Sequence, residues 1–251
     1  MIIERSQKIF NACGADMLFV TAPDLMFYLT GFPGAEGCVT VDGNGTRLYT
    51  DARYSEAASR ALDGSGIQVC PPPAGGYIKL AEGASRLATA LSRTTAEEYI
   101  ALCNAAGEVT DCTSAFDEAM SVKDGGEIAS IRKACEIADE AFTDLLGAFK
   151  EGMSENDAAA ELEYLMRKYG ASGTSFDTIM AFGEGSSVPH HRTGMRRLNS
   201  ATSFSSTSAA SGAATAPTAR ARCSSATTEG TKSSKRPTGT YSRRTLPPRR
   251  I

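Results

Sequence analysis

The sequence predicts a mixed α/β (α+β) protein of two successive parts, followed by a tail of different composition. Short apolar runs alternate with amphipathic segments over residues 1–120, and two longer amphipathic segments follow over 121–199. The composition then changes abruptly at residue 200. Helical and strand-like pieces that alternate around a hairpin are typical of a sheet covered by helices. A chain of 251 residues is long enough to bury two modest cores.

Helices and strands alternate through the first part of the chain. The run Asp42-Gly43-Asn44-Gly45 favours a tight hairpin turn between two strands, because these residues adopt the backbone angles that such turns need. Three prolines at 71–73 indicate a loop. The apolar patterns predict helices over 2–12, 53–62, 77–92 and 96–105, and strands over 17–21, 37–41, 47–50, 66–70 and 108–112.

Two long helices are expected in the second part. Apolar residues recur at spacings of three and four over 128–149 and again over 159–169, the pattern of helices with one buried face. Ser154 is a suitable N-cap for the second helix, Asp157 can complete a capping box, and Gly170 should end it. Both helices should cover one face of a sheet.

A strand and a loop follow the second of these helices. Residues 174–182 are rich in β-branched and aromatic residues, which predicts a strand. Gly183 and Gly185 then introduce a loop that contains the only histidines of the chain, His190 and His191. An isolated histidine in a loop is more often a surface residue than a catalytic one. Two adjacent side chains cannot readily converge on one metal ion without further ligands.

The order and spacing of these segments resemble a known family. The runs G-M-S-E, A-x-E-L-E-x-x-M-R-x-x-G-A-S-G-T-S-F-D-T-I-M-A-F-G and P-H-H lie within residues 152–191. They resemble the opening of the catalytic domain of Xaa-Pro aminopeptidases and Xaa-Pro dipeptidases, which are creatinase and methionine-aminopeptidase-like metallopeptidases. Residues 122–142 resemble the entry helix of that domain. The runs FYLTGF and DGNGTRLYTDARYSEAA resemble the N-terminal domain of the same enzymes.

The resemblance implies a fold and an activity. Residues 1–120 would form a creatinase-type N-terminal mixed-sheet domain, 121–199 the first part of a pita-bread catalytic domain, and 200–251 a disordered tail. The intact enzymes hydrolyse the N-terminal Xaa-Pro bond of peptides with proline at the second position. They use two divalent cations, for which Mn²⁺ is a suitable choice. The N-terminal domain is expected to form a homo-oligomer.

The resemblance also assigns roles to individual residues. A histidine at the position of His190 lies beside the metals and helps to move protons, so His190 would be catalytic, and His191 would be a substrate-binding neighbour. Asp51, Arg53 and Tyr54 match the family's D-x-R-Y element, where we expect a structural ion pair and no substrate contact. The family's metal ligands are two Asp, one His and two Glu in later motifs. We expect no residue of this chain to bind metal.

The tail from residue 200 has a composition unlike that of the residues before it. Residues 1–200 carry 17 Lys and Arg against 28 Asp and Glu, a net charge of −11, whereas residues 201–251 carry 9 and 1, a net charge of +8. The tail also holds 20 Ser and Thr, no valine, and only Phe204, Leu246 and Ile251 as large hydrophobic residues. Such a segment cannot bury enough apolar surface to fold, so we expect it to be disordered.

Three interpretations of this tail compete. One is a basic arm for nucleic acid or anionic surfaces, and another is a natural low-complexity linker. The third is translation out of frame. From Ser200 on, joining the third base of each codon to the first two of the next permits GDVVLLDFGxEWRGYxSDxTRTVLFG. This string contains the D-F-G and S-D-x-T-R-T elements that the family places here, so we expect the chain to be truncated or frameshifted after about residue 199.

Three classes of function follow. The intact gene would encode an Xaa-Pro peptidase, while the chain as written would be inactive because the metal ligands are missing. The alternatives are a non-catalytic module for oligomerisation or peptide binding, and a non-functional fragment. The residues leave aminopeptidase and dipeptidase action open, and they do not exclude creatine hydrolysis.

The remaining composition concerns the cellular setting. Seven cysteines without a C-x-x-C pair indicate reduced thiols in the cytoplasm. The charged start shows no signal peptide, and no apolar run reaches membrane-spanning length. We therefore expect a soluble protein without nucleic-acid or membrane partners.

Overall fold

The computed structural model describes residues 2–34, 36–199, 204–208, 210–211 and 223–224. These residues form two compact units that divide between Asp124 and Gly125. We call them the N-terminal unit and the C-terminal unit. Each contains its own buried apolar cluster of helix and strand residues. The fold is therefore mixed α/β, as the sequence predicts.

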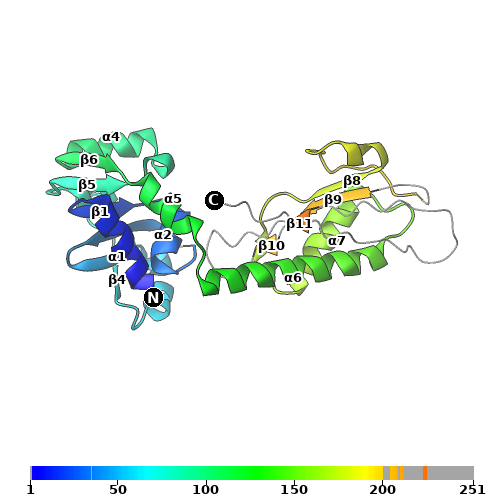
Figure 1. Ribbon diagram of the computed structural model, residues 1–251, viewed down its shortest axis with the longest axis horizontal. Helices are drawn as coiled ribbons and strands as arrows, with labels where there is room; N and C mark the ends of the chain where they lie inside the picture. Colours follow the sequence, from blue (N-terminus) through cyan, green and yellow to red (C-terminus); the bar gives the residue numbers. More distant parts are fainter. Residues whose placement is uncertain (1, 35, 200–203, 209, 212–222, 225–251) are drawn as a thin grey trace. The chain divides into compact units, whose positions relative to one another are not determined.

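The N-terminal unit is built on one six-stranded mixed sheet in the order β4-β3-β2-β1-β5-β6 (Figure 1). The pairs β1–β2 and β2–β3 are antiparallel, whereas β3–β4, β1–β5 and β5–β6 are parallel. The strands are β1 (Met17–Val20), β2 (Gly37–Asp42), β3 (Gly45–Thr50), β4 (Ile67–Cys70), β5 (Arg86–Thr89) and β6 (Glu108–Asp111).

Helices cover both faces of this sheet. Leu18 and Val20 belong to one buried cluster and Phe19 to another, because successive side chains of a strand point to opposite faces. The first cluster includes residues of α1, α2, α3 and α5, and the second includes residues of α4 and η1. These elements are α1 (Ile2–Cys13), α2 (Pro23–Thr30), α3 (Ala52–Ala61), η1 (Tyr77–Ala81), η2 (Leu91–Arg93), α4 (Ala96–Ala105) and α5 (Thr113–Ser121).

The predicted hairpin is confirmed. Asp42 pairs with Gly45 at the end of β2 and β3, and the Asn44 amide donates a hydrogen bond of 2.8 Å to the Asp42 carboxylate across the turn. At the other end of the hairpin, Gly37 has a φ of 150°. A Cβ atom there would lie 2.0 Å from the Tyr49 carbonyl oxygen, so only glycine lets the two strands pair at this point.

The helix predicted over 77–92 is wrong. Residues 77–81 form the short helix η1, and 86–89 form β5, which lies between β1 and β6 in the sheet. Leu87 and Ala88 are fully buried on opposite faces. A strand buried on both faces lacks the alternation of apolar and polar residues that marks a strand, so its short apolar run resembled part of a helix.

The C-terminal unit contains the two predicted long helices, α6 (Gly125–Ala148) and α7 (Glu155–Lys168), which pack against each other. Helix α7 also lies against β8 (Figure 1). The buried cluster joins residues of both helices to Met180 and Phe182 of that strand. The strands preceding residue 200 are β7 (Gly173–Thr174) and β8 (Ile179–Phe182), followed by the short helix η3 (Gly183–Ser187).

The strand predicted over 174–182 is interrupted. Strand geometry holds at 173–174 and 179–182 but not between them. The Thr193 hydroxyl accepts a hydrogen bond from the Met180 amide and donates one to the Thr178 carbonyl. Backbone groups at this point are therefore bonded to a side chain of the following loop.

The structure describes nine residues of the tail, at 204–208, 210–211 and 223–224. These form β9 (Phe204–Ser208), β10 (Ala210–Ser211) and β11 (Cys223–Ser224). Strand β9 pairs antiparallel with β8, and the Phe204 ring packs 4.7 Å from that of Phe149 and 6.5 Å from that of Phe142, measured between ring centroids. One aromatic residue and a strand partner thus order a segment of polar composition. The rest of 200–251 lies outside the described residues.

The predicted capping box at the start of α7 is confirmed and yields the first testable prediction. The Ser154 hydroxyl accepts from the Asp157 amide at 3.1 Å, and the Asp157 carboxylate accepts from the Ser154 amide at 3.0 Å. We expect Ser154→Ala to lower the free energy of unfolding of the C-terminal unit by about 1 kcal/mol, since a helix amide loses its acceptor. Chemical denaturation followed by circular dichroism measures this change.

The matched control is Ser130→Ala on α6. Ser130 is half-buried, and its hydroxyl donates a hydrogen bond of 2.9 Å to the Gly126 carbonyl of its own helix. This change should stay within about 0.5 kcal/mol. Equal effects of the two substitutions would contradict a stabilising role for the cap.

Candidate histidine site

The two histidines lie in a loop that is bound to the start of α7. We call residues 188–198 the histidine loop. Its second half pairs with the backbone that enters the helix: the Leu198 amide donates to the Met153 carbonyl at 2.8 Å, and the Gly152 amide donates to the Leu198 carbonyl at 2.8 Å. Further along, the Glu155 amide donates to the Arg196 carbonyl at 3.0 Å. The loop is therefore held by backbone hydrogen bonds.

A buried carboxylate holds the middle of this loop. The Glu155 side chain is 1% exposed, and its Oε2 lies 2.9 Å from Nε2 of His191. The same oxygen accepts from the Gly194 amide at 2.9 Å, while Oε1 accepts from the Phe182 amide at 2.8 Å. An ionised carboxylate only accepts hydrogen bonds, so Nε2 of His191 carries the proton.

The surroundings of Glu155 favour its ionised form. Burial raises the pKa of the Glu155 carboxyl, but the hydrogen bonds from His191 and from the Phe182 and Gly194 amides outweigh burial and hold this pKa below its ordinary value. The folded state therefore stabilises the carboxylate. This contribution is present above the ordinary carboxyl pKa and is lost as the pH falls through the lowered value.

The two histidines are placed differently. His190 is exposed, whereas the side chain of His191 is 20% exposed and lies on Glu155. The structure thus brings His191 together with a residue that the sequence interpretation missed. Glu155 is an acidic residue in the first turn of a helix, where a favourable interaction with the helix dipole already accounts for it. The catalytic role of His190 and the substrate-binding role of His191 stay predictions.

The donor set of the described residues does not fit a site for two divalent ions. Within those residues, no three His, Cys, Asp or Glu side chains are grouped as metal ligands. Paired ions in hydrolases need several carboxylates close together. Glu155 is already engaged by three N–H donors.

The D-x-R-Y element of the N-terminal unit forms the predicted ion pair. The Arg53 guanidinium donates to Asp51 at 2.7 Å and to Glu36 at 2.6 Å, and it lies 5.2 Å from the centroid of the Tyr54 ring. Asp51 also caps α3 by accepting from the Arg53 amide. The hydrogen bonds from Arg53 lower the pKa of the Asp51 carboxyl. These contacts show a structural role at the start of a helix.

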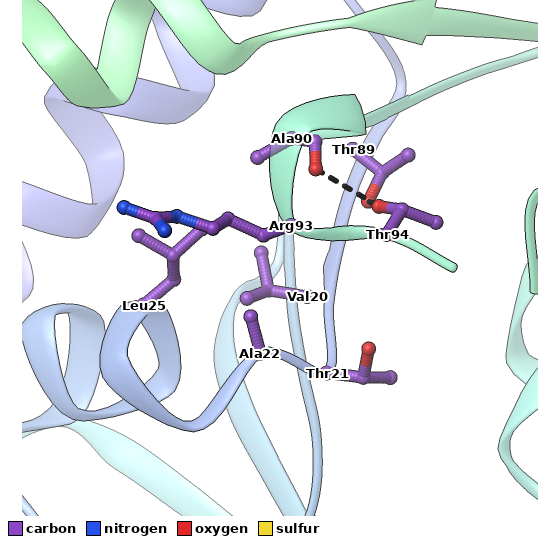
Figure 2. Close-up of a pocket in the computed structure, with 8 residues that line it drawn as sticks. All are labelled: Val20, Thr21, Ala22, Leu25, Thr89, Ala90, Arg93 and Thr94. Carbon is purple, nitrogen blue, oxygen red and sulfur yellow. Dashed lines mark hydrogen bonds between the residues drawn. The ribbon is translucent and has the colours of Figure 1, made fainter. Parts of the chain in front are cut away.

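A small hollow in the N-terminal unit lies where β1 and β5 end (Figure 2). It has essentially no room for a water-sized sphere, whereas ligand pockets usually enclose about several hundred Å³. Arg93 is the charged residue of its lining, and the Thr94 hydroxyl is bonded to the Ala90 carbonyl. The hollow is too small for a dipeptide.

Across the described ranges, none of the helices has the length and apolar character needed to cross a bilayer.

A mixed-sheet unit followed by a helix pair packed on antiparallel strands is the architecture of creatinase-type, pita-bread metallopeptidases. Residues 2–120 match the creatinase/prolidase N-terminal domain, and residues 129–225 match metallopeptidase family M24. The chain belongs to metallopeptidase family M24 and carries a creatinase/prolidase N-terminal domain.

Two curated relatives illustrate the similarity. An uncharacterized peptidase of Bacillus subtilis is 31% identical over 201 residues, which cover 76% of this chain and 55% of the relative. An Xaa-Pro dipeptidase of Pyrococcus furiosus is 30% identical over 192 residues, which cover 75% of this chain and 54% of the relative. The chain thus spans about half the length of these relatives.

Solved structures agree. The Xaa-Pro dipeptidase from Bacillus anthracis superposes with a TM-score of 0.73 at 28% identity, covering 83% of this chain and 60% of that one. The prolidase from Pyrococcus horikoshii gives a TM-score of 0.74 at 27% identity, covering 82% and 60%. The expected fold class is confirmed by these neighbours.

Proposed function

We propose that the intact gene encodes a metal-dependent peptidase that hydrolyses the N-terminal Xaa-Pro bond of peptides, and that the chain as written lacks this activity. The family match carries the first statement, together with relatives named Xaa-Pro dipeptidase. The second is supported by the donor set of the described residues, which does not fit two divalent ions. In the intact form the ions would be Mn²⁺, and the substrate a peptide with proline in second position.

A frameshift near codons 199–200 is the proposed cause, and the packing of β9 supports it. The side chains of Phe204, Ser206 and Ser208 are buried. The hydroxyl oxygen of Ser206 has no hydrogen-bond partner among the described residues, and an unpaired buried hydroxyl costs about 1–3 kcal/mol. Polar residues therefore occupy positions that the core of this unit would fill with apolar side chains.

The shifted reading frame replaces these residues with apolar ones. Each shifted codon takes its last two bases from the first two bases of a codon in the present frame. Phe204 supplies TT, and serine codons of the TC type supply TC at Ser206 and Ser208. Every codon that ends in TT or TC encodes Phe, Leu, Ile or Val. The shift thus restores an apolar inner face to β9, at the place where the family's D-F-G element falls due.

DNA sequencing across codons 195–205 tests this part of the proposal. We expect a one-base deletion relative to a frame that continues as GDVVLLDFG. A confirmed frame that runs unbroken into the present tail, together with a related gene that carries the same tail, would remove the frameshift.

A substitution at Ser206 tests the structural argument separately. We expect Ser206→Ala to raise the free energy of unfolding of the C-terminal unit by about 1 kcal/mol, because an unpaired buried hydroxyl is removed. Ser186→Ala is the matched control, since the Ser186 hydroxyl donates to the Ala181 carbonyl at 3.0 Å and its loss should destabilise. Denaturant midpoints show whether each substitution raises or lowers the free energy of unfolding. A destabilising Ser206→Ala would contradict the packing described for β9.

A non-catalytic module is the second candidate function, and the completeness of the N-terminal unit favours it. That unit has a six-stranded sheet with buried clusters on both faces. Tyr99 and Ile100 on α4 are 40% and 60% exposed, and exposed apolar side chains favour association. We propose a homo-oligomer through this unit, which sedimentation of the purified chain would detect as a mass above that of the monomer.

The proposed setting is the cytoplasm, without nucleic-acid or membrane partners. Cys13, Cys38, Cys70, Cys103 and Cys112 are free thiols, which supports a reducing compartment.

A further inference from the structure

We propose that Glu155 and His191 are positioning residues, which together hold the histidine loop at the start of α7 so that His190 projects from it. The role of His190 rests on the proposed function, whereas the geometry of the pair does not require hydrolysis. The inference gives His191 a different role from the predicted contact with substrate.

Glu155 connects three segments through one carboxylate. Its oxygens accept from the Phe182 amide at the end of β8, from the Gly194 amide in the loop, and from the His191 ring. A carboxylate removed from water is tolerated only where hydrogen bonds replace its hydration. All three donors come from outside the helix that carries Glu155. The carboxylate therefore fixes the strand end and the loop to the start of the helix.

The His191 ring also fits closely against η3. A Cβ atom placed on the buried Gly185 would lie 2.9 Å from Cε1 and 3.1 Å from Nδ1 of His191. The ring thus contacts the backbone of this short helix as well as Glu155. His191 would have to leave the carboxylate and this contact before it could reach a substrate.

The same anchoring leaves His190 available. The Val188 amide donates to the Gly185 carbonyl at 3.0 Å, and the His191 amide donates to the Val188 carbonyl at 3.2 Å. This turn fixes the backbone around His190, whose side chain is exposed. The His191 ring is bound to Glu155, whereas the neighbouring His190 side chain is exposed to solvent. The anchored imidazole of His191 therefore positions that of His190.

Glu155→Gln is the decisive variant because it keeps the shape of the side chain and removes one acceptor. An amide has one acceptor oxygen, so its NH₂ group must face either the Phe182 amide or the donors Gly194 and His191. We expect the loop to be released. Glu151→Gln is the matched control: Glu151 is exposed just before the same helix, and the change in charge is identical.

The measurement uses the full chain, which contains only two histidines. Carbethoxylation by diethyl pyrocarbonate, followed by mass spectrometry, gives the reaction rate of each ring. We expect His190 to react about tenfold or more faster than His191, because burial and hydrogen bonding protect the second ring. In Glu155→Gln the His191 rate should rise to within about threefold of the His190 rate, and in Glu151→Gln it should not change.

Nitrogen-15 labelling of the histidines adds a spectroscopic readout. The His191 ring should show a protonated Nε2, and Glu155→Gln should abolish that signature while the far-ultraviolet dichroism stays unchanged. Equal rates for the two histidines in the unsubstituted chain would overturn the inference. So would unaltered His191 rates and ring signals in Glu155→Gln.

A second pair of variants tests the inference if Glu155→Gln does not fold. His191→Gln keeps a donor for the carboxylate, and His191→Leu does not. Hydrogen exchange at the Gly194 amide should rise about tenfold in His191→Leu and stay near the original rate in His191→Gln. Equal exchange in both would overturn the inference. None of these readouts depends on hydrolysis, so a failed frameshift test would leave them as they are.

Discussion

Inserting one base near codons 199–200 of the gene is expected to convert an inactive product into an Xaa-Pro peptidase. The insertion would restore the D-F-G and S-D-x-T-R-T elements, which supply the two Asp ligands, and would return translation to the frame in which the family's His and two Glu follow. Turnover of an Xaa-Pro dipeptide or tripeptide with added Mn²⁺ should then reach about 1–10³ per second, the usual range for enzymes. Release of the N-terminal residue, followed by chromatography, measures it.

An insertion of three bases at the same site is the control. It adds one residue and keeps the present tail, so its product should remain inactive. Mn²⁺-stimulated hydrolysis by the purified 251-residue chain at a comparable rate would contradict the prediction, because the described donor set would then have to suffice.

The second large effect is expected from Phe204→Ala. Phe204 is 6% exposed, and its ring packs against Phe142 and Phe149. Removing a buried aromatic ring leaves a cavity and costs about 3–5 kcal/mol, so the C-terminal unit should lose much of its free energy of unfolding. Guanidinium denaturation followed by circular dichroism at the helical signal measures the loss.

Tyr164→Ala provides the comparison within the same unit. Tyr164 lies on α7 and is 61% exposed, so its truncation should change the free energy of unfolding by about 0.5 kcal/mol or less. An equally small effect of Phe204→Ala would show that β9 does not pack on the aromatic cluster in solution.

Local signals explain where the fold could be predicted from the sequence. The Asp42 to Gly45 turn and the Ser154 capping box each act through neighbouring residues, and both appear as predicted. The strand β5 could not be recognised in this way. Its position between β1 and β6 is a long-range property, and its two buried faces remove the alternation that identifies a strand.

The candidate site was predicted in its position but not in its contacts. The loop with His190 and His191 follows β8, as the motif order indicates. The partner of His191 is Glu155, which lies 36 residues earlier in the chain. An acidic residue in the first turn of a helix is already explained by its favourable interaction with the helix dipole, so the sequence did not single out Glu155. The strand β9 was missed for another reason, because a composition rich in serine conceals a single well-placed phenylalanine.

The backbone pairing of Leu198 with residues 152 and 153 lies entirely before the proposed frameshift in the chain. Every hydrogen bond described for the histidine loop is made by residues encoded before the proposed slip. All residues that hold the histidine loop would therefore be translated before the proposed frameshift. The folding of the histidine loop can therefore be studied in this chain separately from any hydrolysis.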